Sequence, residues 1–332
     1  MQLENTMQAP RERIDALFND PDPSERFGEL IELVRELIEA DELTEELLED
    51  TQARVRELWK TRDFAVERAS HWTNANYTKL LCPFSVRFSG ERLFEVSSQT
   101  SFGFGLARTL RMVADRRWDK KLGVRHGKGI AAMEALSQLE GIEIAEQSLG
   151  PKGVNAFASS PHLTSLRALS ITGCKSGHEG AAAIANNPAL ANLEILILSQ
   201  GRIESAGAEA LAKSPHLTKL HTLVLDENQL GAAALRAIAE SESLANLRYL
   251  TINSNKNIGA DGVVALANSP HLRSLETLHL RGVNMRTTGA TALANSPILS
   301  TVKELSLFSN NITEKGKQAL RESTTYAGPP IF

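Results

Sequence analysis

The sequence contains little of what disulfide cross-links or a membrane anchor require. Two of its 332 residues are cysteines, Cys82 and Cys174, which excludes a disulfide framework and favours a reducing compartment. No apolar run approaches the roughly 20 residues of a membrane span. The first residues, MQLENTMQAPRERID, have no basic segment followed by an apolar core, which a secretory signal needs. These absences predict a soluble, cytoplasmic protein without a membrane partner.

The sequence also lacks a charge excess and the motifs of catalysis. Its net charge of -4 provides no general attraction to nucleic acid or anionic lipid. GFGLAR at 103–108 lacks the third glycine of a dinucleotide loop, and GVRHGKG at 123–129 lacks the Ser or Thr of a P-loop. No G-x-S-x-G, H-E-x-x-H or C-x-x-C motif occurs. We predict that the protein is not an enzyme and uses no cofactor.

What the sequence does contain is an internal repeat. A leucine recurs at 163, 190, 217, 244, 272 and 299, in steps of 27 or 28 residues, and Leu136 begins a weaker seventh copy. A fixed period of this length is typical of a solenoid, in which each copy buries its apolar face against the next. The repeat therefore predicts one continuous core shared by the copies.

Each copy has two halves that differ in the spacing of their apolar residues. The first half reads L-x-x-L-x-x-L-x-L-x-x-N, as in 217–228, and its L-x-L step predicts a strand. The second half, G-A-x-A-L-A in 207–212, is rich in helix formers. We interpret its glycine as allowing the helix to lie close to the strand layer. That glycine recurs at 153, 180, 207, 262, 289 and 316, with Ala234 in one copy. Prolines that end the helix follow at 161, 188, 215, 270 and 297.

This pattern closely resembles the leucine-rich repeat family, in its ribonuclease-inhibitor-like subclass. The residues that carry the resemblance are L-x-x-L-x-L-x-x-N at 220–228 and 247–255, and L-x-x-L-x-L in the other copies. The resemblance covers about 136–321 and implies an α/β solenoid with parallel strands on the concave face and helices on the convex face. In the family the asparagine bonds neighbouring backbones. Turns that have another residue there should be less well satisfied, namely those with Gln147, Cys174, Gly201 and Val283.

The segment that precedes the repeats resembles no family and is expected to be an α-rich capping or effector domain. Apolar residues share one helical face over 24–39, and a second helix is expected from Thr44 to about Val66. LLCPFSVRF and RLFEVSS are expected to form a short strand pair. The predicted domains are 1–130 for this segment, 131–323 for a solenoid of about seven units, and 324–332 for a tail.

Charge is divided unevenly within the N-terminal segment. Residues 25–50 carry eleven acidic and two basic side chains, whereas 102–128 carries eight Lys or Arg. Solvated faces that dock against each other in the cap are one interpretation. The alternative is nucleic-acid binding by a basic helix through 108–128. Its residues would be Arg108, Arg111, Arg116, Arg117, Trp118, Lys120 and Lys121.

Three histidines invite a metal interpretation, which their spacing opposes. His162, His216 and His271 each precede a repeat leucine, and successive ones lie two copies apart. Neighbouring strands about 4.8 Å apart would separate them by roughly 10 Å. Zinc requires nitrogen atoms about 2.0–2.1 Å away. We predict framework residues and no metal site, and a buried thiol for Cys174.

In leucine-rich repeats the side chains between the strand leucines face the concave surface, and here they vary while the framework does not. The later copies gather the residue types that dominate interface energetics. These are Asp226, Glu227, Tyr249, Asn253, His279, Arg281 and Phe308. They predict non-enzymatic binding of a protein partner. The alternative is that these side chains are only the solvated surface of the strands and bind nothing. The resemblance also allows regulation of a small GTPase, because the Ran GTPase-activating proteins share the repeat class.

Overall fold

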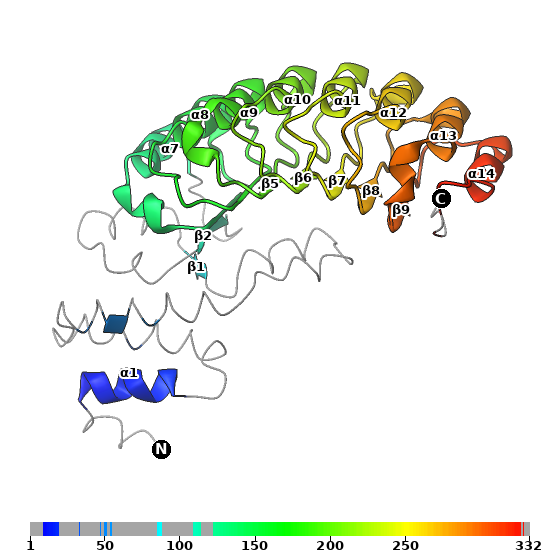
Figure 1. The fold of residues 1–332 in the computed structure, drawn as a ribbon. Helices are drawn as coiled ribbons and strands as arrows, with labels where there is room; N and C mark the ends of the chain where they lie inside the picture. The colour runs from blue at the N-terminus through cyan, green and yellow to red at the C-terminus, as the bar shows by residue number, and fades with distance from the viewer. Residues whose placement is uncertain are drawn as a thin grey trace.

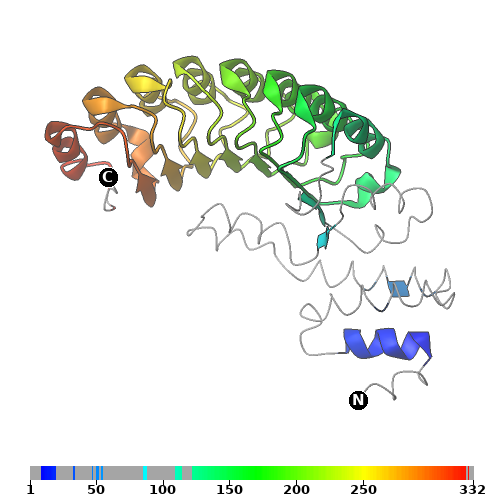
Figure 2. The ribbon, with the colours of Figure 1, turned by 180° about the vertical axis from the view of Figure 1, so that it is seen from behind.

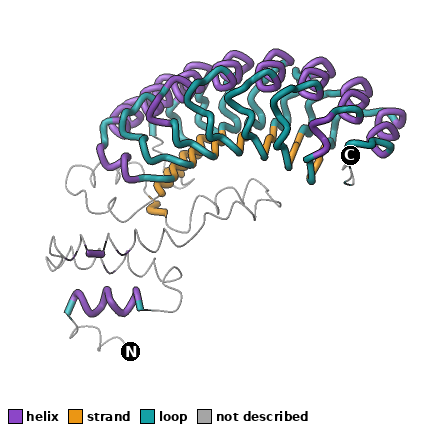
Figure 3. Tube along the Cα trace, viewed as in Figure 1, coloured by secondary structure: helices purple, strands orange, loops and turns teal. Residues whose placement is uncertain are grey.

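The protein forms a curved α/β solenoid, seen in a computed structural model. The structure describes residues 9–19, 33, 47, 50, 51, 54, 85–87, 109–113, 122–326 and 328. Figures 1 and 2 show an arc whose strands line the inner side and whose helices cover the outer side. Figure 3 shows the same alternation of strand, loop and helix along the tube. The predicted fold class is confirmed.

One parallel sheet runs through the solenoid in chain order. Its strands are β1 (Ser85–Arg87), β2 (Thr109–Val113), β3 (Gly141–Ala145), β4 (Ala168–Thr172), β5 (Ile195–Ile197), β6 (Thr222–Val224), β7 (Tyr249–Thr251), β8 (Thr277–His279) and β9 (Glu304–Ser306). Strands pair one copy apart, so that Leu196 lies between Leu169 and Leu223. All three leucines are 0% exposed. The stacked leucine column is therefore the inner boundary of the core.

The helices form the convex layer, and each packs against its neighbours in sequence. They are α7 (Val124–Ala131), α8 (Gly150–Ala158), α9 (Gly177–Asn186), α10 (Glu204–Ala212), α11 (Ala232–Ala239), α12 (Gly259–Ala267), α13 (Arg286–Ala294) and α14 (Glu314–Arg321). Short 3-10 helices occur at η2 (Glu134–Gln138), η3 (Pro188–Leu190) and η4 (Pro297–Ser300). As predicted, the helices end just before the prolines: α8 ends at Ala158 and α10 at Ala212, three residues before Pro161 and Pro215.

The glycine near the start of each helix meets the neighbouring helix, and the prediction that it meets the strand layer is wrong. A Cβ atom at Gly207 would lie 3.0 Å from Ala181 Cβ and 3.3 Å from His178 Cα, both on α9. At Gly262 a Cβ atom would lie 3.1 Å from Ala232 Cα on α11. The small residue is required because consecutive helices stack closely along the convex side.

A ladder of buried asparagines joins the turns after the strands, as the family resemblance implies. Asn255 Oδ1 accepts hydrogen bonds from the backbone N–H groups of Asn228 (2.9 Å) and Leu230 (3.0 Å) in the previous copy. Its Nδ2 donates to Leu225 O at 2.9 Å. Asn310 likewise accepts a hydrogen bond from a backbone N–H of the previous copy, at 2.9 Å. Each asparagine thus satisfies backbone groups that the short strands leave without a partner.

Where another residue replaces the asparagine, the outcome depends on the substitute. The expectation of a poorly satisfied turn is wrong for Gln147, whose Oε1 accepts a hydrogen bond from Leu122 N at 2.9 Å. Gly201 has no side chain that could take the place of the asparagine. The hydroxyl of Ser176 lies close by, 3.5 Å from where a Cβ atom of residue 201 would be. This hydroxyl is buried and has no hydrogen-bond partner within the described ranges, so this turn is less well satisfied, as expected. Cys174 is buried, as predicted.

A second ladder, which was not predicted from the sequence, closes the carboxyl ends of the helices. Ser160 Oγ donates to the carbonyl of Ala131, the last residue of α7, at 2.6 Å. In the next copy Asn187 Nδ2 takes this place and donates to Ala158 O at 2.7 Å. Equivalent bonds are made by Ser214, Ser241, Ser269, Ser296 and Ser323. The ladder satisfies carbonyl groups that a helix end would otherwise leave unpaired.

The three repeat histidines support this serine ladder through their backbones. The N–H groups of His162, His216 and His271 donate to the hydroxyl of the serine two residues earlier, at 3.3, 3.2 and 3.3 Å. Their side chains are partly buried. These bonds use the backbone, so the framework role of the histidine side chains stays a prediction.

The sheet and the core begin upstream of the boundary predicted at residue 131. Leu110 of β2 pairs with Ile142 of β3, and both side chains belong to the apolar core that continues to Tyr326. Ile130 of α7 lies in the same core. β2 and α7 are thus parts of the solenoid, although the sequence placed them in the N-terminal domain. The division of the chain into separate domains stays a prediction.

Strand β1 is where LLCPFSVRF predicted a strand, but its partner in the structure is β2, and the pairing is parallel. The expected partner, RLFEVSS, lies outside the described residues. The basic segment 108–128 is not one helix, because Thr109–Val113 forms β2 and α7 begins at Val124. Arg111 lies in β2, and the other residues proposed for nucleic acid lie outside the described ranges.

Near the N-terminus, helix α1 (Pro10–Phe18) was not predicted. Its Ile14 is 0% exposed, and Asp15 forms an ion pair with Arg54. Leu33 and Leu47, in the two helices predicted at 24–39 and 44–66, are helical and buried. Most of those two helices lies outside the described residues. Over the described residues, no helix has both the length and the apolar composition needed to cross a bilayer.

Candidate interaction face

The concave wall is more closed than the alternation of apolar residues suggests. The side chains between the two apolar residues of each L-x-L step, here called the central column, are 1–8% exposed in six copies: Glu143, Ser170, Ile197, Val224, Thr251 and Ser306. Parallel strands lie about 4.8 Å apart, so neighbours in register cover these side chains, on both sides except at β9, the last strand of the described sheet. The central column therefore mainly builds the wall, and a partner must contact the residues that project beyond it.

Four of the predicted site residues form a continuous row across the turns that follow β6 to β9. Asp226 Oδ1 accepts a hydrogen bond from the backbone N–H of Asn253 at 2.8 Å. Asn253 Oδ1 accepts one from the backbone N–H of Arg281, also at 2.8 Å. The Arg281 guanidinium lies over the Phe308 ring, 5.6 Å from its centroid. The structure thus brings together residues that are up to 82 positions apart, from 226 to 308.

The buried end of this row is Asp226, which is 8% exposed. Burial raises the pKa of its carboxyl, although hydrogen bonds from Asn253 and Thr251 oppose the shift. This carboxylate accepts hydrogen bonds from Thr251 and Asn253, which belong to the wall itself. Asp226 thus positions the neighbouring strand and contributes little to the surface, which corrects its predicted place among the contact residues.

The exposed end of the row is Arg281 with Phe308. Phe308 is 39% exposed, and among the described residues it shares this degree of exposure with one other large apolar side chain, Val124. A guanidinium over an aromatic face is held by a cation–π attraction, worth about 0.5–1 kcal/mol at an exposed site. The pair therefore presents a flat, ordered contact surface that joins β8 to β9.

The remaining predicted residues border this row. His279 Nε2 lies 3.0 Å from Glu304 Oε1, and the His279 side chain is 14% exposed. Tyr249 is half-buried. Desolvation raises the pKa of its hydroxyl, and the negative charge of the nearby Glu276 carboxylate raises it further. Glu227 is exposed, and its Oε2 accepts a hydrogen bond from Gln200 Nε2 at 3.2 Å.

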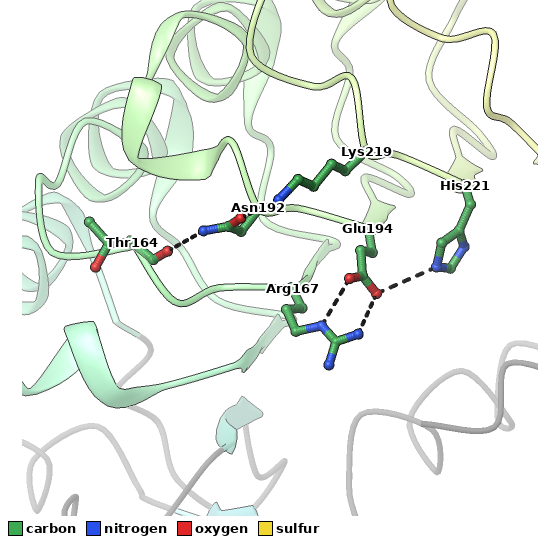
Figure 4. A network of polar contacts seen from close by, with 6 residues as sticks. All are labelled: Thr164, Arg167, Asn192, Glu194, Lys219 and His221. Carbon is green, nitrogen blue, oxygen red and sulfur yellow. Dashed lines mark hydrogen bonds and ion pairs between the residues drawn. The ribbon is translucent and has the colours of Figure 1, made fainter. Parts of the chain in front are cut away.

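A charged column immediately before the strands was not predicted as a feature. Arg167 binds Glu194 through two hydrogen bonds of 2.9 and 3.0 Å, and His221 Nε2 lies 3.7 Å from the same carboxylate (Figure 4). Burial raises the pKa of Glu194, but the bonds from His221 and Arg167 outweigh it and hold the pKa below its ordinary value. The sequence does carry a sign of this column, because the residue before each strand is charged or a histidine in every copy. These residues are Glu140, Arg167, Glu194, His221, Arg248, Glu276 and Lys303.

Comparisons with known proteins agree with this geometry. A family model described as Leucine Rich repeat matches residues 189–212, 243–267 and 299–320. The chain is similar in fold to a chain in the crystal structure of the Rad7 and Elc1 complex in yeast, with a TM-score of 0.50 and 14% identity. That match covers 75% of this chain and 61% of the other chain, so this chain spans less than two thirds of its neighbour's length. The search of curated proteins found no match.

Proposed function

This chain is a leucine-rich repeat protein, and we propose that it binds a protein partner, without catalysis, on the concave face of β6 to β9. The observation that carries the proposal is the exposed Arg281–Phe308 pair. Aromatic and arginine side chains supply most of the binding energy at protein interfaces. Tyr249 on β7, Asn253 in the turn after β7 and His279 on β8 complete the proposed contact surface.

The row behind the pair supports the proposal through preorganisation. Arg281 is anchored by its backbone bond to Asn253, which is itself bonded to the buried Asp226 carboxylate. A partner that contacts this pair loses less conformational entropy than one that must order mobile side chains. The similar fold from yeast was solved as a complex of two proteins, which is in keeping with a binding role. A cytoplasmic location belongs to the same proposal, because the two cysteines favour a reducing compartment.

The proposal predicts that the double variant Tyr249→Ala/Arg281→Ala loses its partner. Full-length protein first serves as bait in native lysate, and the captured protein is identified. The affinity of that purified partner for the purified bait is then measured. We expect the double variant to weaken binding by more than about tenfold, because interface hot spots each contribute about 2 kcal/mol or more.

The matched control is Arg236→Ala, since Arg236 is an exposed arginine on the convex helix α11. It should capture the partner as well as the unchanged protein does. Equal capture by the double variant, with its fold intact by circular dichroism, would remove the concave face from consideration.

A further inference from the structure

A groove of about 890 Å³ lies at the side of the solenoid where the chain enters its last strands. Three of its charged lining residues immediately precede strands: Arg248 precedes β7, Glu276 precedes β8 and Lys303 precedes β9. The fourth, Arg273, lies in the segment between α12 and β8. The groove is thus built by three consecutive copies and borders the candidate interaction face without being part of it.

The groove has a positive balance on a chain that is negative overall. Its lining contains three cationic side chains, Arg248, Arg273 and Lys303, and one carboxylate, Glu276. The full chain has a net charge of -4. A local excess of positive charge in a concave surface attracts a negatively charged ligand.

Glu276 holds two of these cations in place without cancelling the excess. Its Oε1 accepts a hydrogen bond from Arg248 Nε at 2.5 Å, and its Oε2 accepts one from Lys303 Nζ at 2.8 Å. The Glu276 side chain is 18% exposed, whereas those of Arg248 and Lys303 are 46% and 75% exposed. Solvent therefore meets the cations, and the carboxylate lies largely beneath them.

Arg273 is exposed, and within the described ranges only the Nε of its side chain makes a hydrogen bond. Its Nε donates to Pro270 O at 3.2 Å, which fixes the base of the guanidinium. A guanidinium has five N–H donors in a planar fork that matches the two oxygens of a carboxylate. The hydroxyl groups of Ser274, Ser300 and Thr301 also line the groove.

We propose that this groove binds an acidic peptide segment, with carboxylates that pair with Arg273, Arg248 and Lys303. An extended nucleic-acid strand fits less well, because none of the described lining residues is aromatic and single strands use aromatic side chains for stacking. The side-chain hydroxyls and Val302 suit a peptide backbone and its short side chains. The groove lining shares no residue with the proposed contact surface, so each proposal can fail without the other.

The test is a titration in which the full chain is added to a short, fluorescently labelled peptide of alternating Glu and Gly. Fluorescence anisotropy measures the fraction of peptide bound. We expect saturable binding that is at least about tenfold weaker for the matched Gln–Gly peptide, because the charge-assisted hydrogen bonds are lost. Arg273→Ala/Lys303→Ala should weaken binding of the Glu peptide by about tenfold or more. Binding should also weaken as added salt shortens the screening length from about 10 Å to about 3 Å.

The control variant is again Arg236→Ala, which removes an exposed arginine from the convex face and should leave the titration unchanged. Equal affinity for the Glu and Gln peptides, or an unchanged affinity in the Arg273→Ala/Lys303→Ala variant, would overturn the proposal. A single-stranded oligonucleotide of equal charge that displaces the peptide and depends more strongly on the same two residues would overturn it in favour of nucleic acid. The Arg281→Ala/Phe308→Ala variant should bind the peptide normally, which separates this site from the Arg281–Phe308 pair.

Discussion

Replacing Phe157 by alanine is expected to lower the free energy of unfolding by about 3–5 kcal/mol. Phe157 lies on α8, is 0% exposed and is among the largest fully buried side chains of the solenoid. Its position is occupied by Ile184 and Leu211 in the next two copies, and both are also buried. Alanine would remove most of the ring and leave a cavity between copies that depend on one another for their cores.

A matched phenylalanine lies on the surface and provides the control. Phe308→Ala removes a ring that is 39% exposed, and it should cost less than about 1.5 kcal/mol. Urea unfolding of both variants, followed by far-ultraviolet circular dichroism, measures the difference. Equal losses would mean that Phe157 does not fill the core between the first helices of the array.

Asn255→Ala is expected to lower the free energy of unfolding by about 3 kcal/mol, because several buried groups lose their partner at once. The asparagine is 0% exposed. Its side chain donates to the carbonyls of Leu225 (2.9 Å) and Ile252 (3.0 Å) and accepts from the N–H groups of Asn228 and Leu230. Alanine can replace none of these bonds, and the site is buried, because Asn255 and Asn228 are both 0% exposed.

The control for this substitution is Asn268→Ala at the end of α12. That side chain is exposed and donates a single described bond, to Val264 O at 2.9 Å. Its loss should change the free energy of unfolding by about 0.5 kcal/mol or less. Native-state hydrogen exchange should also accelerate at the amides of Asn228 and Leu230 in the Asn255→Ala variant alone. Similar stability losses in both variants would contradict a structural role for the asparagine ladder.

The solenoid was predictable because its determinants are local and repeated. Each L-x-L step specifies a strand, each alanine-rich stretch specifies a helix, and the spacing of 27 or 28 residues specifies that consecutive strands pair. Pairing of Leu169, Leu196 and Leu223 follows directly from that spacing. The same regularity revealed the positions that face the concave side, from which the candidate site was chosen.

The strands upstream of the repeats were not predictable in the same way. β1, β2 and β3 begin at residues 85, 109 and 141, so their steps are 24 and 32 residues and do not match the period. Pairing in a parallel sheet depends on contact in space and tolerates connections of different length. A search for a fixed period therefore ends at β3, whereas the sheet continues to β1.

The sequence predicted which residues border the concave face, but not which of them are buried; their role in binding stays a prediction. Alternation shows which side of a strand a residue faces, but the cover provided by neighbouring strands depends on three-dimensional packing. For this reason Asp226 was expected at the surface and is buried, whereas Phe308 is exposed as expected. The serine ladder was not predicted, because each of its bonds joins two copies of the repeat. Ser160 and Asn187 bond to carbonyl groups 29 residues earlier, and local sequence patterns do not show such a contact.

The most direct test of concave-face binding is hydrogen–deuterium exchange of the full chain, alone and with its purified partner. Binding is expected to slow exchange in 249–253, 277–282 and 304–309, while the convex helices α11 to α13 keep their rates. Protection confined to those helices, with unchanged exchange in the strands and the turns that follow them, would contradict binding on the concave face.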